Sequence, residues 1–89
     1  MRLTLRLSPS LQLAPGHKLE ISLPGKTLAE CLAQTRRRFP EIEQTLWRGQ
    51  QLNPQVLLFH NNTLVREKDL SNRVQVRDVL DVIPAIEGG

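Results

Sequence analysis

The sequence predicts an α+β fold in which one mixed sheet of four to five strands packs against one main helix. Three observations support this prediction. Two segments near the N-terminus alternate apolar and polar residues, one apolar stripe at helical spacing follows them, and β-rich runs occupy the second half. With 89 residues, the chain can form one small domain but not a two-domain enzyme.

Residues 2–7 and 18–23 are predicted as strands because apolar and polar side chains alternate strictly in both. The residues between them are rich in proline and glycine, which is typical of a turn. Pro24-Gly25 ends the second strand. The short segment between the two strands favours their pairing as an antiparallel hairpin.

A helix is predicted to begin at Thr27, because Thr27 and Glu30 have the spacing of a capping box. Pro40 ends this helix. The apolar stripe that would lie on the sheet consists of Leu28, Cys31, Leu32, Thr35 and Phe39.

The middle of the chain contains weaker signals. Residues 41–54 are compatible with a short second helical turn that includes Ile42, Leu46 and Trp47. Residues 55–60 form a nearly continuous apolar run, which predicts a strand buried on both faces. Asn61-Asn62 predicts a tight turn, residues 63–66 a short return strand, and residues 67–72 a loop.

Residues 74–76 are predicted to form a short turn or strand, and residues 78–83 the last strand, which is rich in β-branched residues and ends at Pro84. A right-handed crossover through the helix would place this strand parallel to the first. The simplest fold with this element order is a β-grasp, as a single domain over residues 1–84 with residues 85–89 as an extended, flexible Gly-Gly tail. The predicted core consists of Leu3, Leu5, Leu19, Ile21, Leu28, Leu32, Phe39, Leu58, Leu80 and Val82.

Composition and single residues exclude several classes of function. The net charge of +3 permits acidic partners but is too low for a dedicated nucleic-acid binder. No apolar run is long enough to span a membrane, and Met1 is not followed by a signal peptide, so we expect a cytoplasmic protein. Cys31 falls on the apolar stripe and is interpreted as a small hydrophobic residue.

No catalytic or metal-binding constellation is recognisable. His17 and His60 are isolated from cysteines and from carboxylate clusters, so no metal site is predicted. Glycine-rich phosphate loops and paired catalytic carboxylates are also absent from the sequence. We therefore expect a carrier and substrate of other enzymes rather than a catalyst.

The ending Ile83-Pro-Ala-Ile-Glu-Gly-Gly89 is the most informative segment. A Gly-Gly end has no side chains, so it fits a narrow channel and adopts conformations that other residues resist. The six residues from Pro84 to Gly89 can reach about 20 Å when extended. Such a tail can deliver a carboxylate into the active site of another enzyme, which would have to activate it with ATP.

Three segments resemble the ubiquitin-like sulfur carriers of the MoaD and ThiS type, and most closely the small subunit of molybdopterin synthase. They are Thr27-Leu-Ala-Glu-Cys-Leu, Val56-Leu-Leu-Phe-His-Asn-Asn and Asp78-Val-Leu-Asp-Val-Ile-Pro-Ala-Ile-Glu-Gly-Gly. The resemblance implies that Gly89 is adenylated and converted to a thiocarboxylate, and that Gly88 is a spacer. It further implies that Pro84, Ile86 and Glu87 thread the channel of the partner.

The resemblance also implies the partners. These are an E1-like adenylating enzyme that uses ATP, a persulfide or sulfide donor, and a downstream sulfur acceptor, while the carrier itself binds no cofactor. The carrier could be the small subunit of a synthase. The sulfur would serve a molybdopterin-like cofactor, thiamin, cysteine or a thionucleoside. Phe59 and Val82 are expected near Ile86 on the docking surface.

Two alternatives remain open from the sequence. The first is a ubiquitin-like modifier that is joined to lysines through Gly89. The second is a basic β-grasp module that contacts RNA or protein through Arg2, Arg6 and the cluster Arg36, Arg37 and Arg38. The three clustered arginines lie near the C-terminus of the predicted helix, where cations also complement the helix dipole. Trp47 is compatible with either core packing or partner binding.

Overall fold

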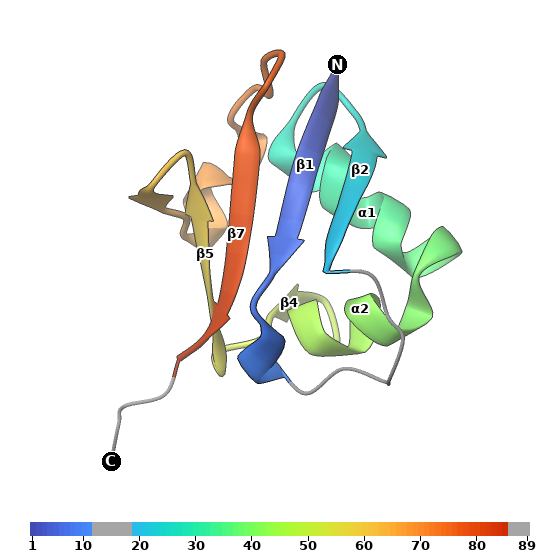
Figure 1. The fold of residues 1–89 in the computed structure, drawn as a ribbon, viewed down its shortest axis with the longest axis vertical. Coiled ribbons are helices and arrows are strands. Elements are labelled where there is room, and N and C mark those ends of the chain that lie inside the picture. Colours follow the sequence, from blue (N-terminus) through green and yellow to red (C-terminus); the bar gives the residue numbers. More distant parts are fainter. Residues whose placement is uncertain (12–18, 86–89) are drawn as a thin grey trace.

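The computed structural model describes residues 1–11 and 19–85, which form a five-stranded sheet with two helices on one of its faces (Figure 1). The strand order across the sheet is β2-β1-β7-β5-β6. In chain order these strands are β1 (Arg2–Leu7), β2 (Glu20–Pro24), β5 (Val56–His60), β6 (Thr63–Leu64) and β7 (Val79–Pro84). The predicted α+β class with a mixed sheet is therefore confirmed.

The predicted strand pairing is confirmed as well. β1 pairs antiparallel with β2, with Leu3 opposite Leu23, and it pairs parallel with β7, with Leu5 opposite Leu80. On its other side β7 pairs antiparallel with β5. β7 is thus the central strand of the sheet, and two neighbours fix its direction.

The main helix α1 (Leu28–Arg38) begins as the capping residues predict. The hydroxyl of Thr27 accepts a hydrogen bond from the backbone N–H of Glu30 at 3.2 Å. The Glu30 carboxylate accepts from the N–H of Lys26 at 2.9 Å, one residue before the position that a standard capping box uses. Pro40 follows the end of α1 and occupies the first turn of a second helix, α2 (Pro40–Leu46), where its missing N–H has no cost.

The segments between the major elements are more ordered than the sequence predicts. Instead of one helical turn, residues 41–54 contain most of α2 and a hairpin, because Ile42 and Leu46 are fully buried and Gly49 adopts a φ of +64° at the turn. The predicted loop 67–72 is largely a 3₁₀ helix, and the return strand is limited to two residues. The small elements are η1 (Pro9–Leu11), β3 (Trp47–Arg48), β4 (Gln51–Leu52) and η2 (Glu67–Ser71).

The core lies between the sheet and the helices, and eight of the ten predicted residues are buried in it. Leu19 is a wrong prediction: it is 41% exposed and lies one residue before β2 begins, although its carbonyl still accepts from the N–H of Leu7 at 2.7 Å. Phe39 is half-buried and packs against the core from the junction of the two helices. The buried apolar residues are Leu3, Leu5, Leu7, Ile21, Leu23, Leu28, Cys31, Leu32, Ile42, Leu46, Leu58, Val65, Val74, Leu80 and Val82.

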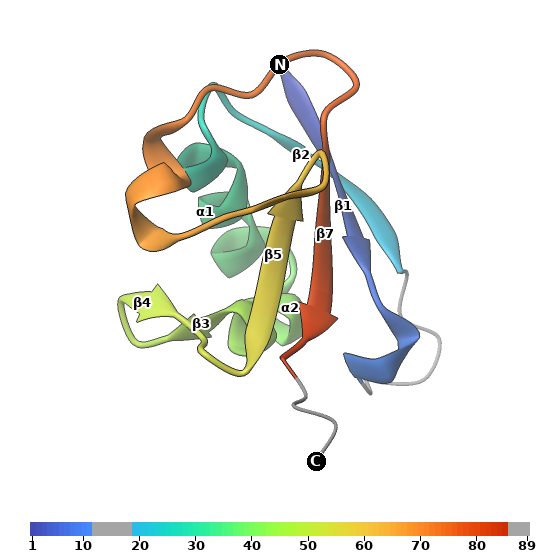
Figure 2. The ribbon, with the colours of Figure 1, turned by 90° about the vertical axis from the view of Figure 1, so that its left-hand side faces the viewer.

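The two faces of the sheet differ in cover. Figure 2 shows α1 and α2 on the same side of the strands. Within β5 only Leu58 is buried, whereas Leu57 and Phe59 are half-buried on the face opposite the helices. The prediction of a strand buried on both faces is therefore wrong, because the described residues form a single helical layer on one face.

Candidate functional site

The structure describes only the first of the tail residues that the sequence points to. Ile86, Glu87, Gly88 and Gly89 lie outside the described residues. Pro84 is the last residue of β7 and pairs with Val56. The backbone N–H of Ala85 still donates to the carbonyl of Gln55 at 2.8 Å. The structure therefore anchors the chain as far as Ala85.

A polar network holds the β5 side of this exit point. The Asn53 side-chain amide donates to the Thr45 carbonyl at 2.8 Å, and its oxygen accepts from the Gln55 N–H at 2.9 Å. Arg48 donates to the same Asn53 oxygen at 3.2 Å and to the Gln55 side-chain oxygen at 2.8 Å. Gln55 is therefore fixed where it receives Ala85. The sequence analysis missed this role; the Asn53-Pro54 dipeptide was the available signal, because Asn side chains bond the backbone two residues on.

The outer face of the sheet, opposite the helices, carries an apolar area that we call the outer patch: Leu57, Phe59, Leu64 and Ile83. Leu57 lies opposite Ile83, and Phe59 lies opposite Leu64, so all four point to the same side. Leu64 is 39% and Ile83 36% exposed. Leu57 and Leu64 also line a hollow of about 260 Å³ beside the free half of β5. Eight of the ten residues that line this hollow lie outside the outer patch, so the patch itself offers a partner an apolar surface.

The expected docking pair of Phe59 and Val82 does not occur on one surface. Phe59 belongs to the outer patch. Val82 is completely buried and faces the helices, opposite Leu58. Side chains alternate between the faces of a strand, so Ile83, the neighbour of Val82, takes the outward position.

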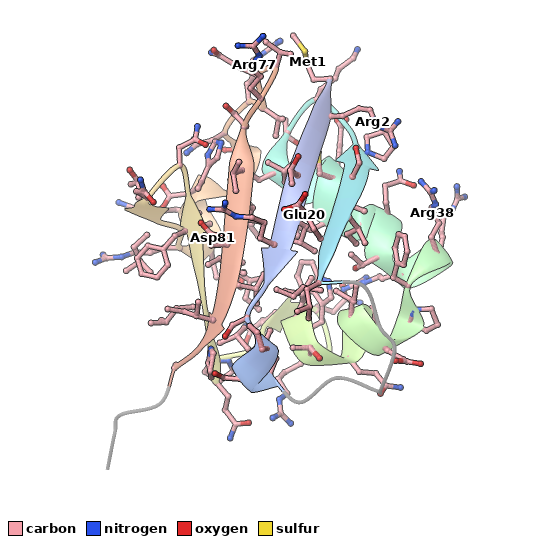
Figure 3. All side chains as sticks on the ribbon, in the orientation of Figure 1. Met1, Arg2, Glu20, Arg38, Arg77 and Asp81 are labelled. Atoms are coloured by element: carbon pink, nitrogen blue, oxygen red, sulfur yellow. The ribbon has the colours of Figure 1, made fainter. Side chains whose placement is uncertain are left out.

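A charged pair borders the outer patch on the β1 side. Arg6 donates two hydrogen bonds to the Asp81 carboxylate, at 2.8 and 3.1 Å, and Asp81 lies opposite Phe59. Hydrogen bonding to Asp81, followed by its charge, raises the pKa of Arg6. Figure 3 shows Asp81 and Glu20 on this face of the sheet. An apolar centre beside a polar border is the usual composition of a protein interface.

His60 lies beside one carboxylate, that of Asp78, which the sequence did not indicate. Its Nε2 lies 2.8 Å from the Asp78 carboxylate, which also accepts from the side-chain amide of Asn61 at 2.9 Å and from the N–H of Gln75 at 2.8 Å. Burial alone would raise the pKa of Asp78, but the hydrogen bonds from Gln75, Asn61 and His60 outweigh it and hold that pKa below its ordinary value of 3.8. The cluster ties the turn after β5 to the start of β7.

This cluster makes stability depend on pH. Because the folded-state pKa of Asp78 is lowered, its contribution is complete above the ordinary pKa and is lost as pH falls through the folded-state value. We expect Asp78→Asn to lower the free energy of unfolding at pH 7 by about 1–3 kcal/mol and to flatten its decrease toward pH 3. Urea unfolding at pH 7, 4 and 3 measures both effects. Asp81→Asn, at a more exposed ion pair, is the control and should cause the smaller loss; equal losses would contradict the assignment.

The other residues that could carry chemistry are buried, packed against neighbouring side chains or exposed on the surface. Cys31 is completely buried, and burial raises the pKa of its thiol, so it behaves as a core residue. The guanidinium of Arg36 lies 4.6 Å from the centre of the Trp47 ring and 3.9 Å from the Glu43 carboxylate, while Arg37 and Arg38 are exposed. Trp47 packs against the core from β3. His17 lies outside the described residues.

Two further observations concern only the described residues. Among residues 1–11 and 19–85, no three His, Cys, Asp or Glu side chains come together in a group that could hold a metal ion. Neither helix in this part of the chain has the length and apolar character needed to cross a membrane.

Comparison with known proteins gives a family and a fold. Residues 9–89 match the ThiS family. None of the curated proteins matches the chain. A chain in the BexX/CysO complex of Amycolatopsis orientalis is similar, with a TM-score of 0.79 and 24% identity, over 98% of this chain and 99% of that chain.

Two other solved structures share the fold. Small archaeal modifier protein 1 from Methanosarcina acetivorans has a TM-score of 0.79 and 18% identity, over 99% of this chain and 96% of that one. A chain in the complex of subunits 1 and 2 of molybdopterin-converting factor from Helicobacter pylori 26695 has a TM-score of 0.65 and 18% identity, with both chains covered completely. These similarities confirm the ubiquitin-like β-grasp fold.

Proposed function

The chain belongs to the ThiS family of ubiquitin-like sulfur carriers, and on this premise we propose that Gly89 is the residue that carries the sulfur. The observation that carries the proposal is the continuity of β7 with the diglycine tail. β7 is the central strand, and the last described hydrogen bond joins Ala85 to Gln55, four residues before the end of the sequence. Four extended residues reach about 13 Å beyond that anchor.

The proposed chemistry takes place in the active site of a partner. The Gly89 carboxylate attacks the α-phosphate of ATP, which forms an acyl adenylate and releases pyrophosphate. Sulfide then attacks the acyl carbon, expels AMP and leaves a thiocarboxylate; a persulfide donor would require reductive cleavage of its S–S bond afterwards. ATP and donor are bound by the partner, so this chain is a substrate at every step.

The outer patch supports a role for the folded domain in this exchange. Because Ile83 and Leu57 lie near the end of β7, a partner that takes the tail can contact the outer patch at the same time. We propose that the outer patch docks on the adenylating enzyme and afterwards on the sulfur acceptor. The carrier has to leave the first enzyme to reach the second, so we expect binding through the outer patch to be reversible.

The test is the intact mass of the full chain before and after incubation with ATP, sulfide and the adenylating enzyme of the same organism. We expect a gain equal to the replacement of one oxygen by sulfur, located at Gly89 by fragmentation. No change in mass would contradict the proposal if the same enzyme preparation releases pyrophosphate from ATP when another carrier is supplied. A ladder of products linked through Gly89 to lysines would indicate a modifier instead.

A further inference from the structure

A cluster of exposed cations lies at the end of the domain where β7 begins, far from the end where β7 leads into the tail. Four basic side chains form it, and we call it the cationic pole: Arg2, Lys26, Arg73 and Arg77. All four are exposed, and Arg2 lies at the β2 side of the pole, where its guanidinium donates to the Ser22 hydroxyl at 2.8 Å. The proposed sulfur chemistry at Gly89 assigns no role to them.

Three separate segments build the cationic pole. The N–H of Gly25 donates to the Met1 carbonyl at 3.0 Å, and the N–H of Val74 donates to the Lys26 carbonyl at 2.9 Å. Arg73 forms an isolated β-bridge with Thr27. Figures 1 and 2 both show the loop before β7 passing close to the N-terminal end, and Figure 3 shows Arg77 beside Met1. Residues distant in sequence therefore meet in one surface.

Two acidic residues, Glu30 and Asp78, lie near the cationic pole, and its four basic side chains outnumber them. Glu30 uses its carboxylate on the N–H of Lys26 at the start of α1. Asp78 is buried and accepts its hydrogen bonds from Gln75, Asn61 and His60. In the described part of the chain, no carboxylate lies within 4 Å of the side-chain nitrogens of Lys26, Arg73 or Arg77. The positive charge of the pole is therefore available to a partner.

The tip of the pole also has features of a binding surface. Arg77 adopts a φ of +70°, which is uncommon for a residue other than glycine and marks a backbone held by its surroundings. Val76, next to it, is 70% exposed, and Met1 is 66% exposed. Arginine and methionine are enriched in protein interfaces, and an exposed apolar side chain among cations can enter a pocket of a partner.

The composition of the pole favours a protein over a nucleic acid. Single-stranded nucleic acids are bound through aromatic stacking, and the three aromatic residues lie elsewhere: Phe39 between the helices, Trp47 in β3 and Phe59 in the outer patch. Four cations are also fewer than the roughly six to ten phosphate contacts typical of DNA-binding proteins.

We propose that the cationic pole is a second docking surface, which binds an acidic segment of the adenylating enzyme while the tail enters its active site. This inference rests on the proposed function. Contacts near both ends of a domain whose longest dimension is 34 Å would fix its orientation, and complementary charge would accelerate the encounter.

The test compares two full-length variants with the same change in charge. The pole variant is Lys26→Gln/Arg73→Gln/Arg77→Asn, in which Asn tolerates the positive φ. The control is Arg37→Gln/Arg38→Gln/Lys68→Gln, at exposed positions outside the pole. Association with the adenylating enzyme is followed by stopped flow between 20 mM and 500 mM salt, after circular dichroism has shown that both variants are folded.

We expect the pole variant to associate about tenfold more slowly at low salt, with a weaker dependence on salt, and the control to stay within about twofold of wild type. Val76→Ser should raise the dissociation rate without changing the association rate. Equal slowing of both variants, or no slowing, would overturn the docking surface while the thiocarboxylate at Gly89 still forms. Tighter binding of a single-stranded oligonucleotide than of the enzyme would also overturn it. If wild type neither associates nor gains sulfur, the proposed function fails with it.

Discussion

Removal of Gly88 and Gly89 is expected to abolish thiocarboxylate formation, with a decrease of more than about 1,000-fold in kcat/KM for the adenylating enzyme. The truncation removes the proposed reacting carboxylate and withdraws the new chain end from the catalytic centre by about 7 Å. Misplacement by about 1 Å can already cost 100-fold in rate. ATP–pyrophosphate exchange and intact mass measure the effect.

The truncated chain should keep its stability, because Ala85, which donates to the carbonyl of Gln55, is the last residue with a described hydrogen bond. Its thermal midpoint should therefore equal that of wild type. Gly88→Ala/Gly89→Ala is the matched control, since it keeps the length and the carboxylate. We expect this variant to lose at least tenfold in kcat/KM, because alanine resists part of the backbone conformations that glycine adopts. Full activity of the truncated chain would refute the assignment of Gly89.

Lysine introduced at two neighbouring positions of β7 should separate folding from docking. Val82 is completely buried, so Val82→Lys places a charge in the core and should cost more than about 4 kcal/mol, a large part of the 5–15 kcal/mol that stabilises a typical domain. Ile83 is 36% exposed on the outer face, where the lysine stem can lie along the surface and its ammonium can reach water. Ile83→Lys should cost less than about 1 kcal/mol.

The two variants should differ in activity for different reasons. Ile83→Lys is expected to remain folded and to lose at least tenfold in kcat/KM for thiocarboxylate formation, because it places a charge in the proposed docking surface. Gln44→Lys, at an exposed position of α2, is the control for added charge and should keep full activity. Urea unfolding and intact-mass kinetics give the two readouts. Wild-type kinetics of a folded Ile83→Lys protein would exclude the outer patch from docking.

Most of the sheet was predictable because local patterns specify it. Alternation in residues 2–7 places Leu3 and Leu5 inward, and the capping residues Thr27 and Glu30 locate the start of α1. Leu19 shows the limit of this reasoning. Its position extends the alternation of β2 and its carbonyl still pairs with Leu7, yet its side chain is exposed. Whether a side chain at the end of a strand is covered depends on the elements packed around it, and no local pattern reports that.

For the candidate site, too, local sequence predicted one part and the paired sheet decided the other. The sequence points to Gly89 through a local and unusual composition, yet it assigned Val82 both to the core and to the docking surface. The register of β7 against β5 decides between these: Val82 lies opposite Leu58 in the core, and Ile83 lies opposite Leu57 outside. A shift of one residue would exchange the two faces, so only the paired sheet settles which residue a partner can contact.

By itself, the sequence determined the fold class, the order of the main strands and the helix, and the diglycine end, because each depends on residues close together in the chain. Only the tertiary structure decided that His60 meets Asp78, that Gln55 receives Ala85, and that Arg2, Lys26, Arg73 and Arg77 share one pole. The physical reason is that these groups are brought together by strand pairing and crossover connections. Contacts of this kind depend on how the whole chain packs, so the periodicity of the sequence does not predict them.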